Sequence, residues 1–166
     1  MPDTTDRLAL PLLAAGQAQK EATHNEALAL AAMLIQSVVQ SVAPASVPTS
    51  PQIGQCWIIG TGAIGAWVGR DGAIACWTSG GWRFADAFPG MCAWNIATAS
   101  FAQHGASSWT VGIANASLYR VNDVQVVGGR QSAIPNPSGG AVIDAESRVA
   151  LGSILAAMRT HGLIAP

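Results

Sequence analysis

Charged residues are scarce in this chain. Of its 166 residues, 8 are Lys or Arg and 9 are Asp or Glu, so 10% are charged, whereas about a quarter is usual in globular domains. Half of the residues are apolar, which leaves few charged side chains to cover a surface in water. Two explanations follow from this composition: burial of surface against other subunits, or insertion into a membrane.

Long apolar runs are also missing. No uninterrupted run reaches the ~18 residues that a membrane-spanning helix needs, which favours burial against other subunits. The apolar run from Leu8 to Ala15 is short and contains Pro11, and the acidic residues Asp3 and Asp6 before it do not suit a secretion signal. We therefore expect no membrane partner and a protein made without Sec export.

Basic patches and metal-ligand motifs are absent from the sequence. The net charge is −1 and the Lys and Arg residues are scattered, so we expect no nucleic-acid partner. Cys56, Cys76 and Cys92 form no CxxC pair, which argues against structural zinc. We expect three free, buried thiols, no metal and no cofactor.

Convergent reactive side chains are not evident either. The three histidines lie in different segments, and no zinc-protease, nucleophile-elbow or phosphate-loop motif occurs. Residues 60–65 spell GxGxxG between two predicted strands, whereas a dinucleotide site needs a strand followed by a helix. We expect no catalytic residues. An enzyme acting on glycan remains an alternative through Asp71 and Asp86, the acids of the tryptophan-rich region.

Six tryptophans are the main feature that is present. Trp57, Trp67 and Trp77 recur every ten residues, and segments 62–67 and 72–77 are near copies of each other. Short segments of this kind between glycine turns predict a small antiparallel meander or barrel. The predicted strands are 56–59, 66–68, 74–78, 82–84 and 91–96, followed by a weaker segment 101–111 and a hairpin over 117–127. Asp-Gly at 71–72 predicts a tight hairpin between 66–68 and 74–78.

Helices are predicted on both sides of this region. Thr23 and Glu26 fit a capping box, and apolar residues then repeat at helical spacing as far as Val42. Near the end of the chain, Asp144 is a good N-cap and Gly162 suits the left-handed position after a helix. The predicted class is α+β, mainly β, with an arm and helix over 1–43, a β domain over 52–128 and a C-terminal helix over 141–166.

The helical stripes are the expected assembly surfaces. A stripe with almost no charge is poorly suited to water, so we expect the N-terminal helix to pack against copies of itself or against the β region. We expect both helices to mediate assembly. The expected interface residues are Leu30, Leu34, Val38, Leu151, Ile154, Leu155 and Met158. For the apolar arm at 8–13, two alternatives stay open: packing on its own domain, or docking on a neighbouring subunit.

The tryptophans have two possible roles. Indoles can fill the core of a small domain that has few Leu and Phe, and an exposed indole can offer a flat face to a sugar ring. The candidate glycan-binding residues are Trp77, Trp82, Arg83, Trp94 and Trp109.

Three stretches carry a resemblance to a known family. The opening from Leu10 to Leu28, the stretch Gly54–Phe84 with Gly80-Gly81-Trp82-Arg83-Phe84, and the ending with Asp144-Ala145-Glu146 and His161-Gly162-Leu163-Ile164 resemble uncharacterised domains of alphaproteobacterial prophages and gene transfer agents. The resemblance covers nearly the whole chain and brings no catalytic residues. Residues 99–112 depart from it, with less aromatic and more Ser/Ala character.

The resemblance implies a structural component of a virion or phage-like particle, a head spike or tail-fibre base that is assembled in the bacterial cytoplasm. Its implied partners are copies of itself, as a trimer or pentamer, and other capsid, spike or tail proteins. Its implied role is attachment at host surface polysaccharide. The alternative is a carbohydrate-binding module that recognises capsular polysaccharide through exposed tryptophan.

Overall fold

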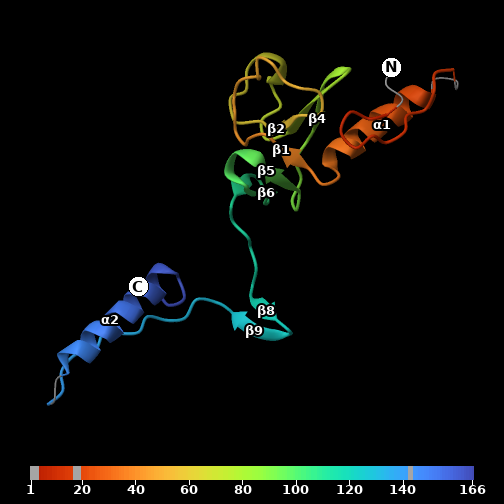
Figure 1. The fold of residues 1–166 in the computed structure, drawn as a ribbon. Helices are drawn as coiled ribbons and strands as arrows, with labels where there is room; N and C mark the ends of the chain where they lie inside the picture. The colour runs from red at the N-terminus through yellow and green to blue at the C-terminus, as the bar shows by residue number, and fades with distance from the viewer. Residues whose placement is uncertain (1–3, 17–19, 142–143) are drawn as a thin grey trace. The chain divides into compact units, whose positions relative to one another are not determined.

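The computed structural model describes residues 4–16, 20–141 and 144–166. It divides into two compact units, Met1–Ile113 and Ala114–Pro166, which are described separately (Figure 1). Helices lie before and after a mainly β region made of open sheets, so the predicted α+β class is confirmed. Neither helix has the length and apolar character needed to cross a bilayer, within the residues described.

The first unit contains one long helix and two sheets. Helix α1 (Lys20–Leu34) leads into β1 (Val38–Val39). A three-stranded sheet follows the chain in the order β2-β3-β4, with strands Cys56–Ile58, Ile74–Thr78 and Gly81–Ala85. A four-stranded sheet has the order β1-β5-β6-β7, in which the last three strands are Cys92–Asn95, Ser100–His104 and Trp109–Val111. All pairs are antiparallel except β1 with β5.

The two faces of the three-stranded sheet belong to different cores. One core is formed by one face of each sheet together with α1, and contains Met33, Val39, Cys56, Ile58, Ile74, Cys76, Met91, Ala93 and Ala102. The opposite face of the three-stranded sheet carries the second core, built around Trp57 and Trp67 and covered by the loop between β2 and β3. Strand alternation explains the division, since successive side chains point to opposite faces.

The first helix begins earlier and ends earlier than predicted. It starts at Lys20, so Thr23 lies inside the helix and is not its N-cap. It ends at Leu34, where the Arg7 guanidinium donates hydrogen bonds to carbonyl oxygens of the last turn and of Ile35 just after it. Gln36 then takes a left-handed φ of 45°. Val38, predicted on the helical stripe, lies in strand β1 instead. Leu30 and Leu34 pack against the first core.

The prediction of a strand at 66–68 is also wrong. Residues Gly65–Trp67 form a short 3-10 helix, η1. The Asp71 carboxylate accepts hydrogen bonds from the Gly62 and Ala63 amides at 2.8 and 3.1 Å. These bonds join the two ends of the loop that contains η1. The predicted turn at Asp71-Gly72 exists, with a φ of 79° at Gly72, but it leads from η1 into β3. The partner of β3 on that side is β2.

The second unit contains a hairpin and a helix. Strands β8 (Tyr119–Val121) and β9 (Val124–Val127) pair around Asn122 and Asp123, whose φ angles of 49° and 62° confirm the predicted turn. Helix α2 spans Ala145–Thr160. The segment after α2 returns to residue 131, where the Gln131 amide donates to the Leu163 carbonyl at 2.9 Å.

The predicted caps of α2 are confirmed. The Asp144 carboxylate accepts a hydrogen bond from the Ser147 amide at 2.9 Å, which makes it the N-cap. At the other end Gly162 has a φ of 73°, and the Leu163 amide donates to the Met158 carbonyl at 2.9 Å. This is the hydrogen bond of a Schellman motif.

Candidate functional site

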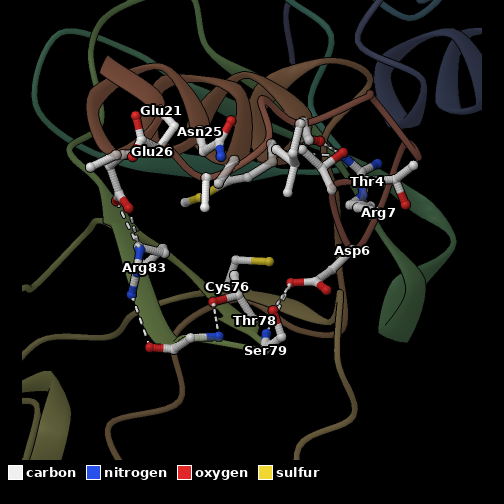
Figure 2. A pocket seen from close by; sticks show the side chains of 18 residues that line it. Thr4, Asp6, Arg7, Glu21, Asn25, Glu26, Cys76, Thr78, Ser79 and Arg83 are labelled. Carbon is white, nitrogen blue, oxygen red and sulfur yellow. Dashed lines mark hydrogen bonds and ion pairs between the residues drawn. The ribbon is translucent and has the colours of Figure 1, made fainter. Parts of the chain in front are cut away.

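A hollow in the first unit lies between the N-terminal arm, helix α1 and the β3–β4 turn. Its volume is about 690 Å³, and Figure 2 shows its polar side chains. Helix α1 supplies Glu21, Asn25 and Glu26, together with an apolar wall that ends in Met33. The arm contributes Thr4–Arg7, Leu12 and Ala15, and the β3–β4 hairpin contributes Cys76, Thr78, Ser79, Gly80 and Arg83.

The arm packs on its own domain in this structure. The Leu13 amide donates to Asn25 Oδ1 at 2.9 Å, and Asn25 Nδ2 donates back to the Leu13 carbonyl at 3.0 Å. The Asp6 carboxylate accepts from the Ser79 amide at 2.9 Å and thereby joins the arm to the β3–β4 turn. The arm therefore forms part of the hollow's wall and is held by polar contacts to α1 and to the β3–β4 turn.

Most charges around this hollow are already paired. The Arg83 guanidinium lies 2.8 Å from Glu26 Oε1 and also donates to the Gly80 carbonyl (Figure 2). Glu21 accepts from the Gly16 amide through Oε1 at 3.3 Å, whereas its buried Oε2 has no partner among the described residues. The hollow thus has one buried acceptor without a partner among the described residues, beside an alanine-rich wall. Its three carboxylates, Asp6, Glu21 and Glu26, each interact with another group of the chain.

A buried thiol pair lies at the edge of the hollow. Cys56 and Cys76 face each other directly across strands β2 and β3, and Cys76 also lines the hollow. A hydrogen bond with Cys76 and the positive charge of Arg7 lower the pKa of Cys56, against the opposing effect of burial. The same thiol–thiol contact and burial raise the pKa of Cys76. Cys92 is exposed, so the expectation of three buried thiols holds for only two of them.

The tryptophans predicted to bind glycan lie in different places. Trp77 and Trp82 are directly opposed across β3 and β4, with ring centroids 5.0 Å apart, and they extend the Trp57–Trp67 core. Arg83 points to the opposite face of the sheet, toward Glu26. The Trp109 indole faces inward and donates to the Gly72 carbonyl at 2.8 Å. The structure therefore does not bring these four residues to one surface.

Trp94 is the candidate that lies on an open surface. It is 37% exposed, and its ring contacts Phe101, which is 61% exposed, in a T-shaped arrangement with centroids 5.0 Å apart. The two residues are register partners on β5 and β6, on the face of the four-stranded sheet that points away from the core. Gln103 shares this face.

Phe101 was not predicted as a site residue. The strand pattern contains the signal, because Cys92 and Trp94 alternate with buried Ala93 and Asn95. The same alternation on β6 places Phe101 beside Trp94 once the register is known. That register depends on pairing between strands, which the sequence pattern alone did not supply.

Metal binding has no evident location in the described ranges. Residues 4–16, 20–141 and 144–166 contain no group of three or more His, Cys, Asp or Glu side chains placed to hold an ion. His104 lies beside Trp109 with ring centroids 5.2 Å apart, so this histidine takes part in packing.

These features define a mainly β protein with an aromatic core, an aromatic pair on an open sheet face and a hollow between the arm and helix α1. The family model described as a protein of unknown function, DUF2793, matches residues 24–110, from within α1 to β7. Because this match covers more than half of the chain, the chain belongs to that family. No curated protein matches the chain, and no solved structure does.

Proposed function

We propose that this protein is a structural component of a phage or gene-transfer-agent particle. It acts as a spike or fibre base that forms a homo-oligomer, contacts other capsid, spike or tail proteins and supports host-surface attachment. The proposal includes assembly in the bacterial cytoplasm and no catalytic activity. The observation that carries it is the large exposed apolar surface of the second unit.

The second unit buries few apolar side chains by itself. Among its described residues, Leu155 and Ile164 are the buried apolar ones, whereas every residue of the β8–β9 hairpin strands is exposed. A two-stranded hairpin alone is marginally stable in water, and exposed apolar surface of this kind is typical of assembly interfaces. Burial of these side chains against a partner would stabilise the complex by about 25 cal/mol per Å² of apolar surface removed from water.

Helix α2 has the residue spacing of a bundle helix. Leu151 and Ile154 are 48% and 54% exposed and lie with Met158 on one side of the helix at intervals of three and four. Two or more copies of such a stripe can bury each other in a parallel bundle. The second copy is the natural occupant, because the resemblance points to fibre-like proteins, which are built from repeated subunits.

The test is the solution mass of the full chain by light scattering. We expect a defined oligomer, and the double change Leu151→Glu and Ile154→Glu should dissociate it. Val149→Glu is the matched control, since Val149 is 71% exposed but lies on the other side of α2. A monodisperse monomer at micromolar concentration, or dissociation by the control change alone, would contradict the oligomer.

The Trp94–Phe101 pair favours a second candidate function, recognition of capsular polysaccharide. An exposed indole beside a second aromatic ring offers an apolar face to a sugar, and Gln103 on the same face supplies hydrogen-bonding groups. Calorimetric titration with purified polysaccharide should detect binding that Trp94→Ala and Phe101→Ala each abolish. Phe88→Ala, which removes another exposed aromatic, should leave the affinity unchanged. Equal affinity in all variants would exclude this surface.

A further inference from the structure

The buried thiols of β2 and β3 have the geometry of a disulfide-forming pair. Cys56 and Cys76 are direct register partners in an antiparallel ladder. The Trp77 amide donates to the Gln55 carbonyl and the Ile59 amide donates to the Ala73 carbonyl, so the hydrogen-bonded pairs fall at alternate positions. By this alternation Cys56 and Cys76 occupy a non-hydrogen-bonded pair.

The orientation of the Cys56 backbone agrees with this position. Its carbonyl accepts from the Gln40 amide at 2.8 Å, on the side of β2 away from β3. Opposed residues of a non-hydrogen-bonded pair have Cα atoms about 4.5 Å apart, which lies within the 4.4–6.8 Å range that disulfides span. Both side chains point to the same face of the sheet, into the first core.

We propose that Cys56 and Cys76 are a thiol–disulfide pair, which a low-molecular-weight disulfide such as oxidised glutathione converts into a cross-strand disulfide. One protein thiolate attacks the glutathione disulfide, forms a mixed disulfide and releases one glutathione thiolate. The second protein thiolate then attacks the protein sulfur of that mixed disulfide and releases the other. Two protein thiols are oxidised, and one glutathione disulfide takes up their two electrons and two protons to become two glutathione thiols.

The surroundings of the pair suit this chemistry. Cys76 lies on the wall of the arm–helix hollow, and Figure 2 shows its side chain projecting from β3 beside Asp6. The Arg7 guanidinium, carried by the same arm, favours the thiolate form of the pair. Breaking of the arm's contacts would expose Cys76 to oxidised glutathione. The disulfide would then link β2 covalently to β3 beside the hollow.

Cys92 provides an internal comparison. It is exposed and closer in sequence to Cys76 than Cys56 is, so an unfolded chain has no reason to prefer the Cys56–Cys76 link. A preference for that link in the folded chain would therefore come from the strand register. The proposal is independent of the function proposed above, since it depends only on the β2–β3 ladder.

In the experiment, the full chain is equilibrated in buffers of reduced and oxidised glutathione, once folded and once unfolded in guanidinium. Exchange is stopped with acid, and the disulfides are then located by mass spectrometry of tryptic peptides without reduction. Trypsin places the three cysteines on three different peptides, 21–70, 71–83 and 84–120. The expected product is peptide 21–70 joined to 71–83, two hydrogens lighter than the sum of its parts. We expect its equilibrium constant to be at least about tenfold higher in the folded chain than in the unfolded chain.

A second measurement removes the dependence on reagent access. The chain is refolded from guanidinium in the same glutathione buffers, where all three thiols start exposed. Cys92→Ser should leave the 56–76 link unchanged, and Cys56→Ser should remove it. If the refolded parent chain keeps both thiols free, or links either of them to Cys92, in a buffer that oxidises the unfolded chain, the proposal is wrong.

Discussion

The guanidinium of Arg7 donates a hydrogen bond to the carbonyl oxygen of Ala32 at 2.8 Å, across 25 residues of sequence. It also reaches the carbonyls of Met33 and Ile35 at 3.3 and 3.0 Å. The last carbonyls of a helix have no partner within the helix, and a cation there is favourable for the helix dipole as well. The N-terminal arm therefore sets the end of helix α1.

Arg7→Ala should lower the stability of the first unit by about 1–3 kcal/mol, because several charge-assisted hydrogen bonds are lost together. Arg7→Lys should recover part of this loss, since a lysine keeps the charge but not the planar fork. Guanidinium unfolding followed by circular dichroism measures both, with the exposed Arg130→Ala as the control. Equal midpoints for the parent chain and Arg7→Ala would show that the arm does not hold the helix end.

Gly60→Ala should strongly destabilise the first unit. A Cβ at position 60 would lie 2.8 Å from the Ala43 carbonyl carbon and closer still to its oxygen, and backbone atoms cannot give way as a flexible side chain can. We expect a loss of at least about 2 kcal/mol. Gly152→Ala is the matched control, because its Cβ meets no described atom within 4 Å and alanine favours a helix interior. Thermal unfolding should show opposite signs for the two changes.

Trp67→Ala should cost about 3–5 kcal/mol, as removal of a fully buried indole leaves a cavity. Trp67 has 0% exposure, and its ring lies 6.3 Å from Trp57 and 5.2 Å from Trp82. Trp94→Ala removes the same side chain from an open sheet face and should cost at most about 1 kcal/mol. Denaturant titration of both variants gives the comparison, and similar costs would contradict the assignment of core and surface.

Acidification should weaken the start of helix α2. Hydrogen bonds from the Ser147 amide and hydroxyl lower the pKa of Asp144 in the folded chain. A lowered pKa means that this contribution to stability is complete above the unfolded value of about 3.9 and is lost as the pH falls through the folded value. The Ser147 amide shift in NMR spectra should follow this loss below about pH 4. Asp144→Asn keeps an acceptor at the cap and should remove this titration.

Features fixed by neighbouring residues were predictable from the sequence. The α2 caps at Asp144 and Gly162 and the turn at Asn122-Asp123 involve contacts within a few residues, so local residue chemistry is enough to find them. The strand at 74–78 was found for a similar reason, since β-branched and aromatic residues lie between two glycine turns. The α+β class follows from these local patterns and from composition.

The end of α1 and the position of each tryptophan needed the tertiary structure. The helix stripe runs on toward Val42 in sequence, yet Arg7 ends the helix and Val38 joins a sheet with Trp94. Trp109 and Trp94 look alike as strand residues, and the β5–β6–β7 register decides that one faces inward and the other outward. Phe101 becomes a site candidate only through its register partner.

The two near copies, residues 62–67 and 72–77, show the division most directly. Local sequence determined that each copy begins at a glycine and ends in a tryptophan, and both glycines take a positive φ in the structure. Only the tertiary structure decided that the first becomes a loop with a 3-10 turn and the second a central strand. The physical reason is that β2 and β4 already pair with both edges of β3, so the first copy cannot pair with that strand. It packs the Trp67 indole against one face of the sheet instead.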